Sequence, residues 1–93
     1  MENMYEELKD LYEFAQAHKD CFTLYNGMDV QVYQYGQQIN FLDKDMLAVK
    51  AYTFEKFNDD VVVVHKYYCM CPGVIDYDRG IEIGLNLKAN SCN

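Results

Sequence analysis

The first part of the chain, residues 3–19, carries the hydrophobic pattern of a single amphipathic helix. Positions spaced four or three residues apart form one mostly apolar stripe: Met4, Leu8, Leu11, Ala15 and His18. This spacing puts the side chains on one face of a helix. Asn3 stands where a cap is expected, and Glu6 follows it as in a capping box. The pattern predicts a helix that packs by one face only.

The rest of this helix surface is acidic. Glu6, Asp10 and Glu13 lie off the apolar stripe, while His18 and Lys19 come at the end of the segment. Negative charge near the start of a helix and positive charge near its end match the helix dipole. We expect a sheet beneath the apolar stripe and an acidic surface on the outer side.

The next part of the chain predicts three short strands. Apolar and polar residues alternate through residues 21–25, and Asn26-Gly27 then supplies a strong two-residue hairpin signal. The alternation resumes through residues 28–35, and Gly36-Gln37 predicts a second tight turn. Residues 39–41 then make a third strand.

Residues 46–57 fit two patterns. A helix would place Leu47, Ala51 and Phe54 on one face, and an aspartate precedes them as a cap. The same residues also alternate with a period of two, and Asn58-Asp59 then forms a turn of the kind that hairpins prefer. The segments on either side of that turn have similar lengths, which favours a long hairpin over a second helix.

Residues 61–70 predict a long strand that begins with four consecutive valines. The strand starts apolar on both faces, so we expect it in the centre of the sheet. Pro72-Gly73 ends it, and residues 76–80 predict a polar loop. Residues 81–87 then alternate as a one-sided strand, and residues 89–93 predict a frayed tail.

Together these elements predict an α+β fold. An N-terminal helix packs on an antiparallel sheet of five or six strands, with residues 46–57 taken as a strand rather than a second helix. Residues 1–93 are expected to form a single domain with one modest core.

The excess of acidic residues limits the kind of partner that the protein is expected to bind. Fifteen acidic residues against eight basic ones give the chain a net charge of −7. Direct binding to nucleic acid needs a basic surface, so it is disfavoured here. An acidic surface serves solubility or attracts a basic protein surface. We therefore expect a protein partner with a basic surface, and neither nucleic acid nor membrane.

The cysteines are the residues whose redox state depends on the cellular compartment. The chain starts with acidic residues instead of a basic, then apolar, leader, and no run approaches the ~20 apolar residues of a membrane span. Cys21, Cys69, Cys71 and Cys92 are accordingly expected as thiols in a reducing cytoplasm.

His65, Cys69 and Cys71 are the residues best suited to chemistry. On one strand face, and with Cys21 or Cys92 as a fourth ligand, they would supply the donors of a tetrahedral zinc site. A single Cys-x-Cys pair is a weak metal signal, so we expect no metal and no cofactor. A thiol paired with His65 lacks a third, orienting group, and no enzymatic activity is expected.

Tyrosines and carboxylates are the candidates for partner binding. Tyrosine covers apolar surface and keeps a hydroxyl at water, which suits an interface anchor. The predicted anchors are Tyr33, Tyr35 and Tyr52, with Tyr67 beside them. Carboxylates would add electrostatic complementarity to a basic partner. The predicted carboxylates are Glu6, Asp10, Glu13, Asp59 and Asp60.

We therefore expect a small, acidic, non-enzymatic binding or inhibitor protein. By analogy of class, its size, acidity and lack of catalytic motif are similar to phage-encoded anti-defence proteins, including anti-CRISPR inhibitors that block nucleic-acid-binding surfaces. Two alternatives stay open: a metal- or ligand-binding domain built on His65, Cys69 and Cys71, and a self-associating structural protein. The state expected in solution is a monomer or a homodimer.

Overall fold

The structure is a computed structural model that describes residues 2–88, and the side chains of residues 4–88. The predicted tail at residues 89–93, which includes Cys92, lies outside the described residues.

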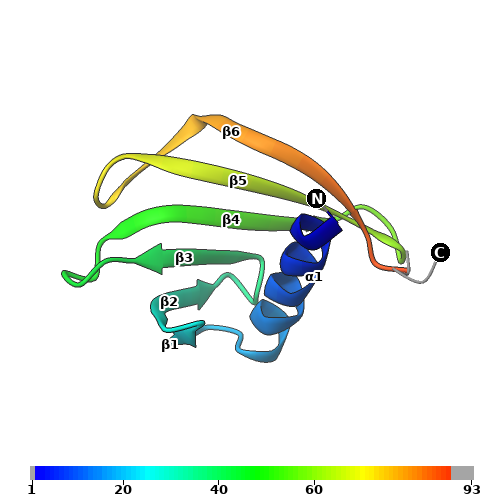
Figure 1. Cartoon of the computed structure of the whole chain (residues 1–93), viewed down its shortest axis with the longest axis horizontal. Coiled ribbons are helices and arrows are strands. Elements are labelled where there is room, and N and C mark those ends of the chain that lie inside the picture. The colour runs from blue at the N-terminus through cyan, green and yellow to red at the C-terminus, as the bar shows by residue number, and fades with distance from the viewer. Residues whose placement is uncertain (1, 89–93) are drawn as a thin grey trace.

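Residues 2–88 form one helix and six strands (Figure 1). The elements are α1 (Glu2–Ala17), β1 (Cys21–Tyr25), β2 (Met28–Tyr33), β3 (Gln38–Leu42), β4 (Ala48–Lys56), β5 (Val61–Cys71) and β6 (Val74–Asn86). The strands lie in the sheet in chain order, and each is antiparallel to the next. The predicted α+β fold is confirmed, with six strands.

Helix α1 crosses one face of the sheet (Figure 1). The middle of its apolar stripe is buried as the spacing predicts: Leu8 and Leu11 are 6% and 4% exposed, and Ala15 has no exposed surface. Met4, at the start of the stripe, is 46% exposed. Asn3 lies inside the helix, not before it. At the far end, His18 Nδ1 lies 2.9 Å from the Phe14 carbonyl oxygen, and the two rings stack. A helix end that would otherwise leave carbonyls unpaired thus gains a partner.

Aromatic side chains connect α1 to the sheet. Tyr12 meets Phe54 edge to face at 5.4 Å, and Phe14 meets Tyr25 at 4.7 Å between ring centroids. Tyr25 in turn contacts Phe41. Such pairs contribute about 0.5–1.5 kcal/mol each beyond the burial of their surface. The helix is therefore held by directional aromatic contacts as well as by its apolar stripe.

Residues that alternate along the strands form the core beneath the helix. Five branched side chains are fully buried there: Val30, Val32, Ile39, Val62 and Val64. Burying one such side chain stabilises the fold by about 1.5–3 kcal/mol. Val61 and Val63 are half-buried and point to the opposite face. The valine run thus faces both ways, as expected.

The valine strand is not at the centre of the sheet, contrary to the prediction. β5 is the fifth of six strands, and β3 and β4 occupy the middle. β6 is long enough to pair with almost all of β5. β5 is nevertheless an interior strand, because it is hydrogen-bonded to β4 on one side and to β6 on the other.

In two segments the prediction from the local sequence pattern can be compared with the observed strand pairing. Residues 48–56 form strand β4, as the hairpin pattern favoured, and Phe54 pairs with Val64 of β5. Residues 76–80 are not the predicted loop, because β6 begins at Val74 and runs through them. Asp76 and Gly80 pair with β5, so pairing at both ends carries the strand through this polar stretch.

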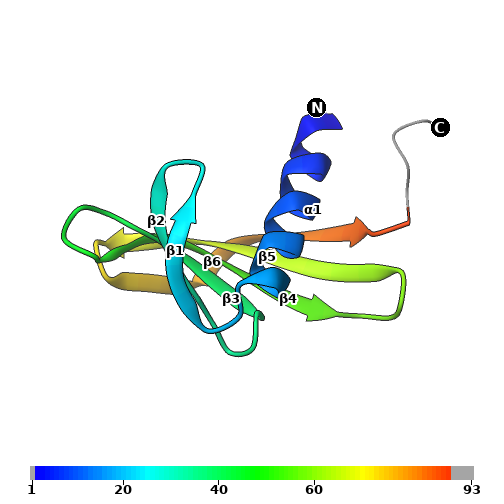
Figure 2. The same ribbon diagram turned by 90° about the horizontal axis from the view of Figure 1, so that it is seen from below.

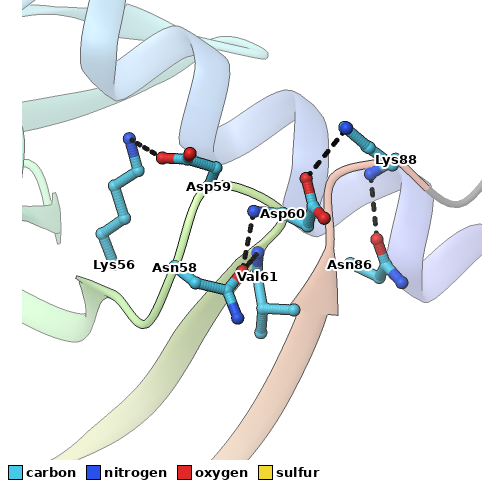
Figure 3. Close-up of polar contacts among 7 residues, drawn as sticks. All are labelled: Lys56, Asn58, Asp59, Asp60, Val61, Asn86 and Lys88. Atoms are coloured by element: carbon cyan, nitrogen blue, oxygen red, sulfur yellow. Dashed lines mark hydrogen bonds and ion pairs between the residues drawn. The ribbon is translucent and has the colours of Figure 1, made fainter.

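The β4–β5 turn is organised by one asparagine (Figure 3). Asn58 Oδ1 accepts hydrogen bonds from the backbone nitrogens of Asp60, at 2.7 Å, and Val61, at 2.9 Å. Lys88 Nζ lies 3.2 Å from Asp60 Oδ1, although no donor meets that oxygen with hydrogen-bond geometry. We therefore treat this contact as an ion pair. It joins the end of β6 to the turn.

Replacing Asn58 should weaken the hairpin, while the neighbouring aspartate should not matter. Asn58→Ala removes an acceptor for two backbone donors, and we expect a loss of about 1 kcal/mol in the free energy of unfolding. Asp59 forms only a long contact to Lys56, at 3.9 Å, and is 99% exposed. Asp59→Ala should therefore leave stability unchanged in the same urea titration. Equal stability of both variants would contradict the role given to Asn58.

Candidate functional site

The two faces of the sheet differ in what covers them. Helix α1 lies on the face that carries Val32, Ile39 and Tyr52, and among residues 2–88 no helix lies on the other (Figure 2). We call this second face the open face. Because side chains alternate along each strand, the register assigns every strand residue to one face or the other.

The open face carries two rows of cross-strand neighbours. One row runs from β1 to β6 through Phe22, Gln31, Asn40, Ala51, Tyr67 and Gly80. The adjacent row runs from β2 to β6 through Tyr33, Gln38, Thr53, His65 and Glu82. Glu82 is the one carboxylate in the two rows, which contain no lysine or arginine. The middle of the open face is thus built of aromatic, amide and hydroxyl groups.

Three tyrosines come together over the middle of these rows. The Tyr67 and Tyr77 rings meet edge to face, with centroids 5.0 Å apart. Burial raises the pKa of the Tyr33 hydroxyl; nearby Tyr77 raises it further, and a hydrogen bond with Asn40 opposes the shift. Tyr33 belongs to β2 and Tyr77 to β6, so these side chains reach toward each other across three strands. Ala51 beneath them has no exposed surface.

A bulge in β6 places Tyr77. Tyr67 pairs with Gly80 and Tyr68 pairs with Asp76, which leaves residues 77–79 without partners on β5. Extra residues in one strand of an antiparallel pair bend that strand and redirect its side chains. Arg79 Nε lies 3.7 Å from Asp76 Oδ2 across the bulge. The bulge is therefore the local feature that brings a β6 tyrosine to the cluster.

Gly80 closes the bulge where β6 comes very near β5. A Cβ atom added at Gly80 would lie 2.6 Å from the backbone oxygen of Lys66. Real Cβ atoms do not approach a carbonyl oxygen that closely. Only glycine lets the two backbones approach this closely.

His65 borders the tyrosine cluster. Its ring is nearly parallel to that of Tyr67, with centroids 5.8 Å apart and planes 15° apart. Its Nε2 lies 3.6 Å from Glu82 Oε1 on the neighbouring strand. Protonation of His65 would complete an ion pair, whereas the neutral ring serves as one more aromatic surface. The side chains of the pair are 31% exposed for His65 and 64% exposed for Glu82.

The strand lysines and most of the strand carboxylates lie on opposite faces; the exception is Asp76, which pairs with Tyr68 on the helix side. By register, the strand lysines Lys50, Lys56 and Lys66 belong to the helix side. The carboxylates of Asp29, Glu55 and Glu82 belong to the open face. The open face therefore combines an uncharged middle with acidic positions around it.

The predicted partner-binding residues fall in three places. Glu6, Asp10 and Glu13 are exposed on α1. Asp59 and Asp60 lie at the β4–β5 turn, where Asp60 is engaged with Lys88. The structure does not bring these two acidic groups onto the open face.

The predicted tyrosines are also separated. Tyr33 lies in the cluster on the open face, whereas Tyr35 is 78% exposed in the turn after β2. The Tyr35 backbone nitrogen donates to Asp20 Oδ1 at 3.1 Å, which holds that turn near the end of α1. Tyr52 is only 8% exposed, under the helix. We therefore leave Tyr52 out of any protein-binding surface.

Sequence reasoning missed Tyr77. It lies in the stretch that was predicted to be a loop, so no face was assigned to it. Gly80, one of the few glycines in a strand-like stretch, was the available signal for a bulge.

The thiols do not form a metal site within residues 2–88, where no three His, Cys, Asp or Glu side chains are placed to hold an ion. Cys21, on β1, donates its Sγ hydrogen to the His18 carbonyl oxygen at 3.0 Å. Burial and the nearby Cys71 raise the pKa of the Cys69 thiol. An activated nucleophile needs the opposite shift.

In comparisons with known proteins, no family model, no curated protein and no solved structure matched this chain. Within the part of the chain that the structure describes, no helix is long and apolar enough to cross a membrane. The function is therefore argued from this chain's own residues.

Two glycines of β6 give a matched test of the bulge. Gly80→Ala forces a Cβ against the Lys66 carbonyl, and we expect a loss of about 1–3 kcal/mol in the free energy of unfolding. A Cβ at Gly84 would meet nothing within 4 Å. Gly84→Ala should be neutral or stabilise by up to about 1 kcal/mol. Urea unfolding followed by far-UV circular dichroism measures both, and equal values would argue against the close approach at Gly80.

Proposed function

We propose that this protein acts by binding another protein through the open face, without catalysing a reaction. The observation that carries the proposal is the uncharged row of aromatic and amide side chains on that face, in a chain of net charge −7. The centres of protein interfaces are depleted in charge and enriched in tyrosine. Tyrosine supplies a large contact area at a low cost in conformational entropy.

The charges around the row support a basic partner. Asp29, Glu55 and Glu82 share the open face, and their strands place no lysine there. Opposite charge at the rim of an interface raises the association rate more than the affinity. The net charge of −7 adds long-range attraction to a basic surface.

We propose further that the partner is a protein that uses its basic surface to hold nucleic acid. Covering that surface would block nucleic-acid binding, so the protein would act as an inhibitor. A standard interface removes about 800 Å² from each partner. The described chain has a total accessible surface of 6165 Å². Such a contact would cover roughly an eighth of that surface.

The test compares the open face with the acidic helix. Tagged protein is incubated with a lysate of the source cells, and any protein that is retained is identified by mass spectrometry and then purified. Tyr77 is 58% exposed on the open face, and Tyr5 is 51% exposed on α1. We expect Tyr77→Ala to weaken binding of the purified partner by about tenfold or more, and Tyr5→Ala to leave it unchanged.

A charge-reversed helix separates the two acidic surfaces. In a variant with Glu6, Asp10 and Glu13 all changed to lysine, we expect slower association at low salt but nearly unchanged dissociation. Added duplex DNA should compete with the protein for the partner. If the helix variant abolishes binding while Tyr77→Ala binds normally, the interface is on α1 and the open-face proposal fails.

Self-association is the second candidate, and one observation favours it. β1 is an edge strand, and its open-face residues Phe22 and Leu24 are 62% and 60% exposed. Exposed apolar edge strands tend to pair with another chain. Leu24→Lys places a charge on that edge. If the edge pairs, light scattering should show a dimer for the wild type and a monomer for Leu24→Lys. A wild type that is monomeric at all concentrations removes this candidate.

A further inference from the structure

A groove lies on the opposite side of the sheet from the open face. Helix α1 and the β1–β2 hairpin rise on the same side of the long strands (Figure 2). The space lined by both has a volume of about 480 Å³. Small-molecule sites are usually about 300–1,000 Å³ and mostly apolar, with a few polar groups. The walls here are largely apolar and include Leu8, Leu11 and Ile83.

Two lysines form part of the floor. Lys66 pairs with Tyr52 across β4 and β5, and Lys50 pairs with Tyr68 in the same register. Lysines and tyrosines thus alternate in a two-by-two pattern, and the two lysines are diagonal neighbours. Diagonal neighbours on one sheet face lie about 7–8 Å apart, within reach of long side chains.

Aromatic rings, not carboxylates, neighbour these ammonium groups. Lys50 Nζ lies 4.7 Å from the centre of the Phe41 ring, and Lys66 Nζ lies 5.1 Å from that of Tyr68. The four ion pairs among residues 4–88 involve neither lysine. Glu7 also lines the groove, but it forms no ion pair with either lysine. Both lysines are half-buried, and no ion pair with a described carboxylate neutralises either ammonium group, so both charges are available to an anionic ligand.

The two positive charges disfavour each other. Burial lowers the pKa of Lys50, and the nearby charge of Lys66 lowers it further. A negative group between the two ammonium groups would be attracted by both and would offset their repulsion. A group that lies in an apolar groove also feels less screening by salt than one at the open surface.

We propose that this groove binds a small molecule with an apolar chain and a single carboxylate, of the fatty-acid class. The carboxylate lies between Lys50 and Lys66, and the chain lies along the apolar wall formed by Leu8, Leu11 and Ile83. A single charge is favoured because Glu7 on the groove wall and the net charge of −7 both repel a dianion such as phosphate. The site is independent of the proposed protein-binding face.

The probe is decanoate, titrated into the full chain by calorimetry and by nuclear magnetic resonance. We expect one site, with shifts confined to the groove residues. Decan-1-ol has the same chain without the charge, and decyltrimethylammonium reverses it. Decan-1-ol should bind about tenfold or more weakly, and the cation should not bind. Absence of decanoate binding, or equal binding of decan-1-ol, overturns the proposal.

Charge-neutral variants test the lysines. Lys50→Met and Lys66→Met keep the apolar stems and should each weaken decanoate binding by about tenfold. Lys56→Met changes net charge by the same amount on the same strand and face, but Lys56 does not line the groove. It should leave decanoate affinity within about twofold of the wild type. Equal losses in the three variants would mean a general charge effect and would overturn the proposal.

A second pair of variants does not alter the lysines. Ile81 pairs with Lys66 across β5 and β6, lines the groove and is 48% exposed. Ile81→Glu places a carboxylate beside Lys66 and should abolish decanoate binding. Ile81→Gln introduces a side chain of the same shape as glutamate but without the charge, and it should retain most of the binding. Equal binding by both variants overturns the proposal. Tyr77→Ala should not alter decanoate affinity, so failure here and failure of the open-face proposal can be told apart.

Discussion

The packing of one apolar helical stripe on one side of the sheet is the constraint on which the rest of this structure depends. Leu8, Leu11 and Ala15 cover buried valines on one side only, so the two faces have different environments. Because strand side chains alternate, this single contact decides which residues become core and which stay at the surface. A one-residue slip would exchange the two sets, and Val62 and Val64 oppose such a slip by their complete burial.

The chemistry of the chain follows from the same alternation. Tyr52 and Lys66 lie beneath the helix, while the adjacent Ala51, His65 and Tyr67 lie on the open face. Residues that are adjacent in sequence thus lie on opposite faces of β4 and β5. Lysines gather on the helix side, and an aromatic and amide surface with acidic neighbours forms on the other. The net charge of −7 alone would not reveal this difference between the two faces.

Much of the fold could be predicted from local patterns, and the exceptions have physical causes. The helix and the β4–β5 hairpin have strong periodicity and a clear turn signal, and both were predicted. Residues 76–80 were not, because the strand passes through this polar stretch by pairing with β5 at its two ends, Asp76 and Gly80, and not by a pattern in its own sequence. Tyr52 lies between Ala51 and Thr53, and Tyr67 lies between Lys66 and Tyr68, so periodicity alone could not show which of the two rings faces the helix. The tyrosine cluster depended on a bulge, which a single sequence signals only by one glycine.

The bulge also explains how a small sheet can carry a structured surface without a second covering layer. A flat open face would leave Ala51 and Asn40 in water and present isolated side chains. Residues 77–79 break the pairing of β6, and Tyr77 then reaches the rings of neighbouring strands. The close approach of the two backbones requires glycine at position 80, so this arrangement depends on that one residue. Packed tyrosines lose less freedom on binding than mobile ones, so the strand irregularity would favour the protein contact proposed for the open face.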